Sequence, residues 1–502
     1  MAWAAWGKAA YTGLQVGVLA VMARLLAPAD FGVVSAALVV IGLSTVFSQL
    51  GFGPALVQRA ELEQRHLDTA FIASLLFGAL LGAIIWLGAP SAAALLRMEG
   101  ATPVLRVLAW VFPLQGLGVA AESLLRRELR FQWLANLDVS AYAIGYGLVG
   151  IALALAGWGV WALVAGQITQ GLLRTGVLLI YRRPSLRQPF DLRAFRDLVY
   201  FGGGFTVARA ANYVAVQGDN LVVGRFLGPQ ALGFYGRAYS LMSAPAYSFG
   251  NVLDQVLFPA MAKVQHDPQR LAMAYRRGVS LIALLVLAPS AALLLLGPEF
   301  IDVVLGHRWA PTVAPFQILT LGMLFRTSYK MSDSLARSTG AVYRRAWRQI
   351  LYAALVVLGA WIGQHWGIAG VAWGALAALA VNFFVMAELS LSVTGMTWAA
   401  FWHAHLPAVR LTLASFPIVW VATLALRHFA LPPLVVLGCA AAVAAASTLV
   451  LWLRSPQLFL GPDGLWILEA LRGVLPRRLG GHRGSRAEDR SLYQGAGAEN
   501  AP

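Results

Sequence analysis

Charged side chains stand at helical spacing inside the apolar segments of this chain, and they are its best candidates for chemistry. One set lies near residue 324 with spacings of i, i+4, i+7 and i+11: Arg326, Lys330, Asp333 and Arg337. This spacing places all four side chains on one face of a helix. An ionisable group at mid-bilayer costs at least ~2.5–3.5 kcal/mol, so we expect the stripe to face a cavity or a partner. Because three cations oppose one carboxylate, we expect this face to bind an anion.

Polar side chains follow one face of five other predicted helices. Two of these helices lie in the second half of the chain and carry Arg209, Asn212, Gln217, Asp219 and Asn220, then Arg237, Ser240, Tyr247, Asn251 and Asp254. Three lie in the first half and carry Gln115, Glu122 and Arg126, then Asp138, Tyr142 and Tyr146, then Gln167, Gln170 and Arg174. Helices with one polar face predict a water-filled central cavity. The cations of the second half make that cavity basic, which suits a phosphate because Arg binds phosphate through two parallel hydrogen bonds.

Several of these residues allow a second interpretation. Arg24 and Arg225 stand at the ends of predicted helices, where an arginine either snorkels to the membrane surface or faces the cavity. Glu122 and Arg126, four residues apart, form either a self-neutralising pair or a coupling site. Cys439 is the single cysteine and lies in an apolar run, which excludes a disulfide and a cysteine-based metal site. No Ser/His/Asp or Cys/His constellation occurs, so no metal ligand or catalytic residue is predicted.

The segments that carry these residues are long enough to cross a membrane. The chain has 502 residues, of which 59% are hydrophobic and 12% are charged, and its mean hydropathy is +0.69. A soluble protein would carry about a quarter of charged residues. We therefore predict an all-α polytopic membrane protein with about fourteen transmembrane helices. Their centres lie near residues 17, 43, 79, 113, 147, 170, 211, 245, 287, 324, 356, 379, 416 and 443.

The basic residues fix a predicted orientation. Loops after even-numbered helices are basic, as in "RRELRFQW" and "RSTGAVYRRAWR", whereas the opposite loops, such as "APAD" and "QHWG", are short and poor in Lys and Arg. Basic loops stay in the cytoplasm, so both termini are predicted to be cytoplasmic. The net charge of +16 is thereby explained without a nucleic-acid partner.

An internal repeat divides the chain. "ARLLAPADFG" at 23–32 and "GRFLGPQALG" at 224–233 share Arg, Leu, Pro and Gly at an offset of 201 residues. Two later matches, "PAL" with "PAM" and "WGVWALVAG" with "WGIAGVAWG", have offsets of 205 and 208. We infer two copies of one six-helix unit. Six is even, so the copies are parallel, with the substrate path expected at their interface.

The predicted organisation follows from this repeat. It comprises an N-terminal six-helix lobe at 1–181, a basic cytoplasmic linker at 182–197, a C-terminal six-helix lobe at 198–390, two additional transmembrane helices at 406–453, and a partly disordered cytoplasmic tail at 454–502. The tail has few apolar residues after its basic start, which is typical of a segment without a packed core.

Several motifs together resemble one known family. They are "ARLLAPADFG", "LGFGPALVQR" (50–59), "LLRRELRF" (124–131), "GVWALVAGQI" (159–168) and "GDNLVVGRFLGPQALGFYGRAYSL" (218–241). The chain resembles the polysaccharide-transporter branch of the multidrug/oligosaccharidyl-lipid/polysaccharide exporter superfamily, in particular the Wzx-type flippases. The resemblance implies a MATE-like arrangement of the two lobes around a central cavity. One departure is "QGD" at 217–219, where relatives often read "NLD".

The resemblance also implies a function. Such proteins move undecaprenyl-diphosphate-linked oligosaccharide repeat units from the cytoplasmic to the periplasmic leaflet of the bacterial inner membrane by alternating access. A proton or sodium gradient or the membrane potential drives them, without a cofactor. The implied partners are this lipid-linked substrate, membrane lipids, and a polysaccharide polymerase with its co-polymerase, and the carrier is expected to be a monomer.

The residues and the resemblance together give a candidate site. The predicted contacts to the diphosphate and glycan are Arg174, Arg209, Asn212, Arg237, Tyr247, Asn251, Arg326 and Lys330. The predicted coupling-ion residues are Glu122, Asp219 and Asp333. Two other functions stay open: a flippase for another prenyl-diphosphate lipid such as the peptidoglycan precursor, and a membrane glycosyltransferase or polysaccharide polymerase. The second class needs long external loops, and the longest predicted here is about fifteen residues around 299–309, so we predict a carrier and not an enzyme.

Overall fold

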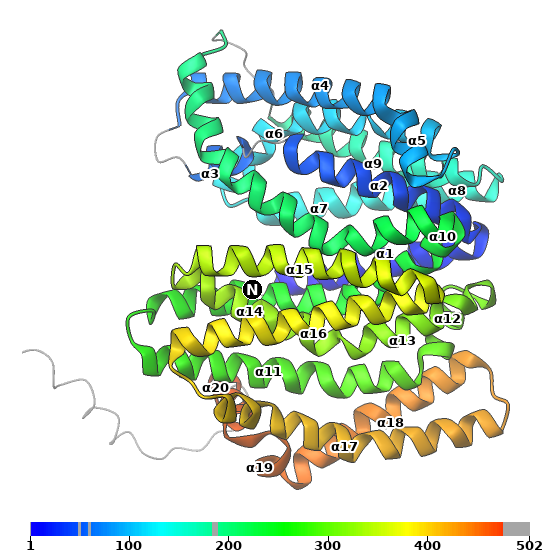
Figure 1. Ribbon diagram of the computed structural model, residues 1–502, viewed down its shortest axis with the longest axis vertical. Coiled ribbons are helices and arrows are strands. Elements are labelled where there is room, and N and C mark those ends of the chain that lie inside the picture. Colours follow the sequence, from blue (N-terminus) through cyan, green and yellow to red (C-terminus); the bar gives the residue numbers. More distant parts are fainter. Residues whose placement is uncertain (1, 49–51, 59–61, 183–188, 475–502) are drawn as a thin grey trace, which may run out of the picture.

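The computed structural model describes residues 2–48, 52–58, 62–182 and 189–474. Within these ranges, it does not describe the side chains of residues 2–10, 46–48, 54, 58, 197–211, 246–256, 259, 260, 342, 467, 468 and 470–474. The described residues form helices and connecting turns without a strand. Figure 1 shows two stacked groups of helices and a helical pair at one edge.

The first group, called the first lobe, contains the helices up to residue 181. They are α1 (Ala2–Leu25), α2 (Pro28–Ser48), α3 (Phe52–Gln58), α4 (Gln64–Leu96), α5 (Ala101–Leu108), α6 (Val111–Arg127), α7 (Phe131–Tyr142), the π-helix η1 (Ala143–Gly150), α8 (Ile151–Leu155) and α9 (Val160–Tyr181). Pro28 begins α2, where its fixed φ favours a helix start. Arg97 ends α4 in the left-handed conformation, with φ of 54°.

The second group, called the second lobe, contains the helices from α10 to α16. They are α10 (Leu192–Lys263), α11 (Pro268–Leu295), α12 (Gly297–Val304), the 3₁₀-helix η2 (His307–Thr312), α13 (Val313–Leu321), α14 (Met323–Ser338), α15 (Val342–Gly363), η3 (Gln364–Trp366) and α16 (Gly367–Thr394). Gly228 splits α10 into two membrane-length halves, because its φ of 86° and ψ of 178° are not helical. A glycine suits this turn since L-residues rarely adopt a positive φ.

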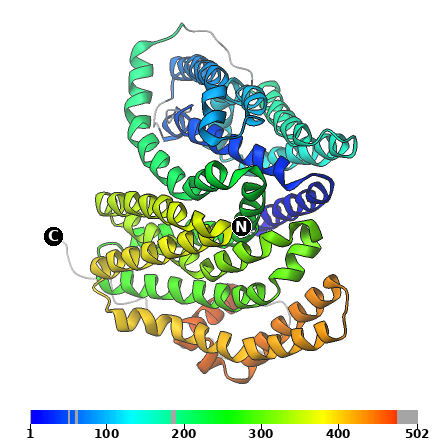
Figure 2. The same ribbon diagram turned by 45° about the vertical axis from the view of Figure 1, so that its right-hand side comes forward.

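The beginning of α10 connects the two lobes. Asp191 caps the helix by accepting hydrogen bonds from the backbone N–H groups of Arg193 and Ala194, and these bonds hold the pKa of Asp191 below its ordinary value. Phe195 in the first turn packs against Phe52 of the first lobe, with ring centroids 6.1 Å apart. Figure 2 shows α10 descending from the first lobe to the level at which the lobes meet.

A C-terminal pair of helices lies outside both lobes. It consists of α17 (Trp398–His428) and α18 (Pro433–Arg454), followed by α19 (Pro456–Phe459) and α20 (Gly461–Val474). Arg427 of α17 forms a two-pronged ion pair with Glu299 of α12, at 2.7 and 2.9 Å. At the opposite end, Arg276 of α11 binds Asp463 of α20 at 2.9 Å. The pair is therefore attached to the second lobe at both ends.

Every predicted helix centre falls inside a helix of the structure. By length and composition, nine segments of the described part qualify as membrane spans, one of which, 343–394, contains both α15 and α16. The all-α polytopic fold is confirmed, while the count of fourteen crossings stays a prediction. Residues 183–188 of the predicted linker and 475–502 of the predicted tail lie outside the described residues.

Glycine pairs pack neighbouring helices in equivalent places of the two lobes. A Cβ on Gly145 of η1 would lie 2.7 Å from the carbonyl oxygen of Gly166 on α9. In the second lobe, a Cβ on Gly359 of α15 would lie 2.7 Å from the carbonyl oxygen of Gly374 on α16. Gly166 and Gly374 end the "WGVWALVAG" and "WGIAGVAWG" segments. The repeat in sequence is therefore also a repeat in helix packing.

Candidate functional site between the lobes

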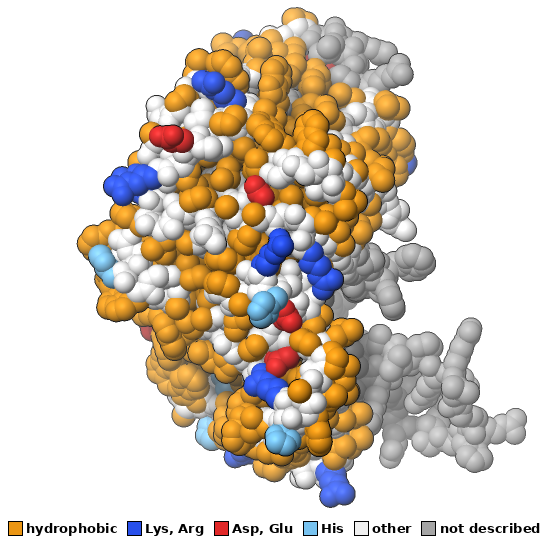
Figure 3. Space-filling view, turned by 90° about the vertical axis from the view of Figure 1, so that its right-hand side faces the viewer, with side chains coloured by type: hydrophobic (Ala, Val, Ile, Leu, Met, Phe, Trp, Pro, Cys, Tyr) orange, Lys and Arg blue, Asp and Glu red, His pale blue; other side chains and the backbone are white. Residues whose placement is uncertain are grey.

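The two ends of the helices differ in charge, which gives a frame for describing the site. Both copies of the repeated motif, 23–32 and 224–233, lie at the end where α1 meets α2 and where α10 turns at Gly228 (right in Figure 1). This end is called the motif end, and the opposite one, with the arginine-rich loops, is called the basic end. Figure 3 looks onto the motif end, where charged side chains of both signs and histidines are scattered among hydrophobic side chains.

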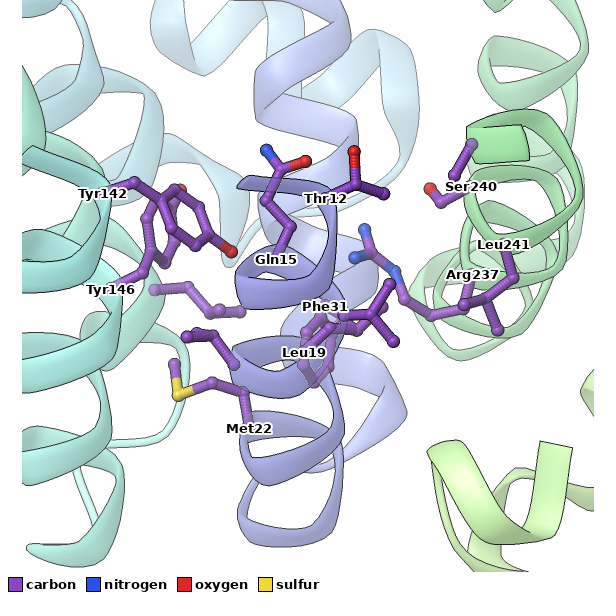
Figure 4. A pocket seen from close by; sticks show the side chains of 14 residues that line it. Thr12, Gln15, Leu19, Met22, Phe31, Tyr142, Tyr146, Arg237, Ser240 and Leu241 are labelled. Carbon is purple, nitrogen blue, oxygen red and sulfur yellow. The ribbon is translucent and has the colours of Figure 1, made fainter. Parts of the chain in front are cut away.

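A cavity of about 250 Å³ lies between the lobes. Polar groups from α1, the α7–η1 junction and the second half of α10 share its wall with apolar side chains. The polar lining residues are Thr12, Gln15, Tyr142, Tyr146, Arg237 and Ser240. Figure 4 shows the two tyrosines on one side of α1 and Arg237 on the other. The predicted central cavity thus exists, with one wall from each lobe.

Arg237 is the cation of this cavity. Its guanidinium carbon lies 5.1 Å from the centroid of the Phe31 ring, and its Nη2 donates a long hydrogen bond of 3.5 Å to Ser35 Oγ. Its Nε is buried and has no hydrogen-bond partner. Among the described side chains, no carboxylate forms an ion pair with Arg237. A cation that is partly buried without a counter-ion is costly, so this position is suited to an anion brought by a ligand.

Two tyrosines, Tyr142 and Tyr146, line the facing wall, and Tyr11 packs beside them. The rings of Tyr142 and Tyr146 stack with centroids 5.1 Å apart, and Tyr11 meets Tyr142 edge-on at 5.6 Å. Tyr146 donates a hydrogen bond of 2.7 Å to Gln167 Oε1, which fixes its ring. Tyr146 lies inside η1, so a π-helical turn positions this wall. π-helical turns are rare and frequently occur at functional sites.

Arg326 and Asp219 meet inside the second lobe rather than in the inter-lobe cavity. Arg326 is 5% exposed and donates a hydrogen bond of 2.6 Å to Tyr239 Oη. Asp219 is 2% exposed and accepts a hydrogen bond of 2.7 Å from Tyr235 Oη. Arg326 also interacts electrostatically with Asp219. The structure therefore brings one predicted cation and one predicted coupling residue together in a single buried network.

Asp333 has two arginine partners. It accepts a hydrogen bond of 3.1 Å from Arg337 Nε and forms an ion pair with Arg345 of α15. Lys330, one turn earlier on α14, is partly buried. The four residues of the predicted stripe lie on the single helix α14, as expected. Their face packs against α10 and α15, and Asp333 is paired with arginines of α14 and α15.

Arg174 and Glu122 lie together in the first lobe. Arg174 binds Glu122 at 3.0 Å and Asp138 at 2.7 Å, and Glu122 also binds Arg126 at 2.7 Å. They border a second cavity of about 310 Å³, whose other polar residues are Thr45, Gln115, Gln167, Gln170 and Thr175. Glu122 and Arg126 thus form an ion pair, which is the first of the two interpretations given above. The pair belongs to a larger network that also contains Arg174 and Asp138.

The remaining predicted contacts lie on α10. Asn212 is exposed, and the side chains of Arg209, Tyr247 and Asn251 lie outside the described residues. Of the polar residues of the central cavity, only Arg237 was predicted as a contact. Tyr142, Tyr146 and Ser240 were predicted on polar helix faces but not as contacts, and Thr12 and Gln15 were not predicted at all, although they are polar side chains three residues apart in a mostly apolar first helix.

Comparisons with known proteins agree with this architecture. The profile of a family described as "Polysaccharide biosynthesis protein" matches residues 21–314. The chain is 25% identical to the teichuronic acid biosynthesis protein TuaB of Bacillus subtilis (strain 168), covering 82% of this chain and 87% of TuaB. It is 24% identical to the lipopolysaccharide biosynthesis protein WzxC of Escherichia coli (strain K12), covering 76% and 79%. It is 27% identical to the succinoglycan biosynthesis transport protein ExoT of Rhizobium meliloti (strain 1021), covering 84% of both chains.

Solved structures share the fold. The lipid II flippase MurJ in its inward closed conformation aligns with a TM-score of 0.74 at 13% identity, over 90% of this chain and 98% of MurJ. An inward-facing multidrug resistance MATE family transporter of the MOP superfamily aligns with a TM-score of 0.61 at 17% identity, over 78% and 99%. The match to the family profile spans more than half of the chain, and the predicted two-lobed fold is confirmed. The chain therefore belongs to the polysaccharide biosynthesis protein family and is a membrane carrier of the Wzx flippase type, not an enzyme.

Proposed function

We propose that this carrier moves an undecaprenyl-diphosphate-linked oligosaccharide repeat unit from the cytoplasmic to the periplasmic leaflet of the bacterial inner membrane. The basic end would face the cytoplasm, in line with the positive-inside rule, and both termini would lie there. The lobes would rock against each other, so that the inter-lobe cavity opens to one side at a time. The names of TuaB, WzxC and ExoT, all assigned to polysaccharide biosynthesis, support this substrate class.

The observation that carries the proposal is Arg237. This partly buried guanidinium has no carboxylate partner among the described side chains and lines the cavity between the lobes. A diphosphate would supply the missing negative charge and accept hydrogen bonds from Nε and Nη. Tyr142 and Tyr146 of the cavity wall would offer ring faces and hydroxyl groups to the sugars, while the prenyl chain stays in the lipid.

The other predicted residues receive different roles in the proposal. Arg326 would act through Tyr239 and Asp219, and Lys330, Arg209, Asn212, Tyr247 and Asn251 would contribute to the second-lobe side of the path. Asp219 would take up the coupling proton or cation, because its only side-chain hydrogen-bond donor among the described residues is Tyr235. Asp333, Glu122 and Arg174, which are held in ion pairs, would hold helices together as each lobe moves.

Partners follow from the same proposal. The carrier would work as a monomer, because the cavity lies between two lobes of one chain. It would deliver its substrate to a polysaccharide polymerase and its co-polymerase. The energy source would be an ion gradient or the membrane potential.

Binding of the lipid-linked substrate tests the proposal. The purified protein is titrated with a prenyl-diphosphate oligosaccharide and, separately, with the peptidoglycan lipid precursor. Arg237→Ala should weaken binding of the first ligand at least tenfold, the loss of about 1.4 kcal/mol. Arg270→Ala is the matched control, because this side chain is 76% exposed at the basic end. Equal affinity of Arg237→Ala and the unaltered protein for the prenyl-diphosphate oligosaccharide would contradict the proposed site. Tighter binding of the peptidoglycan precursor would show that this precursor, and not the oligosaccharide repeat unit, is the substrate.

A further inference from the structure

The two copies of the repeated motif pack against each other in space. A Cβ on Gly32 of the first copy would collide with the backbone carbonyl of Pro229 in the second copy. A Cβ on Gly233 of the second copy would collide with the backbone carbonyl of Pro28 in the first. The same pair of residue types thus makes the same contact twice, with the lobes exchanged. Glycine is required at both positions because the backbones approach too closely for any side chain.

The repeated arginines complete this exchange. Arg24 of the first lobe donates a hydrogen bond of 2.7 Å to the carbonyl of Val303, at the end of α12 in the second lobe. Arg225 of the second lobe donates a hydrogen bond to the carbonyl of Leu95, at the end of α4 in the first lobe. Each arginine therefore binds a free carbonyl at a helix C-terminus of the opposite lobe, where a cation is favourable. Neither of the two roles expected for them from sequence describes this contact.

An aromatic cluster buries the contact. Trp309 of the second lobe is fully buried and donates a hydrogen bond of 2.9 Å from Nε1 to the carbonyl of Ala23 in the first lobe. Its ring meets Phe31 of the first motif edge-on at 5.3 Å and Phe234, next to the second motif, at 5.8 Å. Polar and apolar contacts between the lobes thus coincide at the motif end.

The inter-lobe cavity ends at these contacts. Along α1 its lining runs from Thr12 through Leu19 to Met22, and the first motif begins at the next residue. Phe31 of the motif is itself part of the lining. The motif pair therefore closes the cavity at the motif end.

We propose that the two motif copies form a reciprocal latch, which keeps the lobes together at the motif end and must separate before the cavity opens there. The latch consists of Arg24, Pro28 and Gly32 on one side and Arg225, Pro229 and Gly233 on the other. The two sequences are alike because each copy provides the surface against which the other packs. This inference rests on the proposed function, since it requires lobes that move during transport.

A disulfide across the latch tests it directly. Ser35 and Gly236 lie one turn beyond Gly32 and Gly233 on α2 and α10, and a Cβ on Gly236 would lie 3.6 Å from Ser35 Oγ. This close approach makes the two positions the inter-lobe pair to cross-link. In a Cys439→Ala background, oxidised Ser35→Cys/Gly236→Cys should flip at least about tenfold more slowly than the same variant in its reduced form, and dithiothreitol should restore the reduced rate.

A second cysteine pair, with both residues inside the first lobe, controls for effects of oxidation that do not depend on linking the two lobes. A Cβ on Gly53 of α3 would lie 3.5 Å from Ser123 Oγ of α6, so Gly53→Cys/Ser123→Cys introduces the same two residue types at nearly the same separation. Its oxidation should leave the flipping rate within about twofold, because both cysteines move with one lobe. Continued flipping by the oxidised inter-lobe pair would overturn the latch.

A second experiment uses variants that weaken the latch contact instead of cross-linking it. Gly32→Ala and Gly233→Ala should each raise the labelling rate of a Ser240→Cys reporter by an impermeant maleimide added from the motif side, by about tenfold. The control is Gly78→Ala, whose Cβ would lie 2.6 Å from the Phe112 carbonyl within the first lobe and should not change labelling. Unchanged labelling of both latch variants would overturn the inference. Failure of the unaltered protein to flip any prenyl-diphosphate glycan would instead overturn the proposed function.

Discussion

At the scale of single residues, two kinds of arginine differ in their partners within the described part of the chain. Arg174, Arg337 and Arg427 are neutralised by carboxylates within the chain. Arg237 has no such partner among the described residues and faces the cavity. A paired arginine holds helices together, whereas an arginine without a counter-ion is ready to accept an anion. This difference, and not the number of cations, distinguishes the proposed diphosphate contact.

Substitution of Arg174 tests the first class. Arg174→Met leaves Glu122 and Asp138 without their shared cation, so the melting temperature in detergent should fall. The loss should stay below the ~3–5 kcal/mol typical of a fully buried pair, because the Arg174 side chain is 27% exposed. The double variant Arg174→Met/Asp138→Asn should recover much of the loss, since Glu122 keeps its ion pair with Arg126 and no carboxylate is left unpaired. If Arg174→Met is as stable as the unaltered protein, the ion pairs of Arg174 do not stabilise the first lobe.

Substitution of Asp219 tests the coupling role. Asp219→Asn keeps the size of the side chain but removes the carboxylate that accepts the Tyr235 hydrogen bond. We expect the variant to bind the lipid-linked substrate within about threefold of the unaltered protein and to lose acceleration of flipping by an ion gradient. Liposomes with and without proton or sodium gradients provide the measurement. Gradient-driven acceleration of normal size in this variant would exclude Asp219 as the coupling residue.

At the scale of elements, glycine contacts set the packing of the helices. On α15 and α16, Gly359 faces Gly374 and Gly363 faces Gly370, so the two backbones touch along about one helical turn. Helices in membranes associate through such small residues, because lipid provides no hydrophobic drive between them. The equivalent pair in the first lobe, Gly145 with Gly166, shows that this packing belongs to the six-helix unit.

Two glycines of similar helical setting test this packing. Gly363 is buried against the backbone of Gly370, whereas Gly438 of α18 is exposed with no atom within 4 Å of its would-be Cβ. Gly363→Ala should lower the melting temperature, because the helices must separate. Gly438→Ala should leave the melting temperature unchanged or raise it slightly, because alanine stabilises a helix by up to about 1 kcal/mol relative to glycine. The opposite order of the two melting temperatures would contradict the packing.

At the scale of the whole molecule, the sequence was informative about elements and less so about their neighbours. Apolar runs place all fourteen predicted centres inside helices, and the repeat predicts the two lobes. Helical spacing also shows which residues share a face, as for Arg326 and Asp333. Spacing cannot say which helix covers that face, and here α10 and α15 cover it, so Arg326 lies within the second lobe. Nor can it reveal the π-helical turn that positions Tyr146.

Transbilayer movement of a defined substrate in liposomes tests the central claim most directly. The protein is reconstituted with a labelled prenyl-diphosphate oligosaccharide, and the fraction of label reachable by an impermeant reagent is followed over time. The account predicts that the unaltered protein carries the inner-leaflet half of the substrate outward, while Arg237→Ala leaves it in place and Arg270→Ala behaves as the unaltered protein. Movement no faster than in protein-free liposomes, or equally fast with Arg237→Ala, would contradict it.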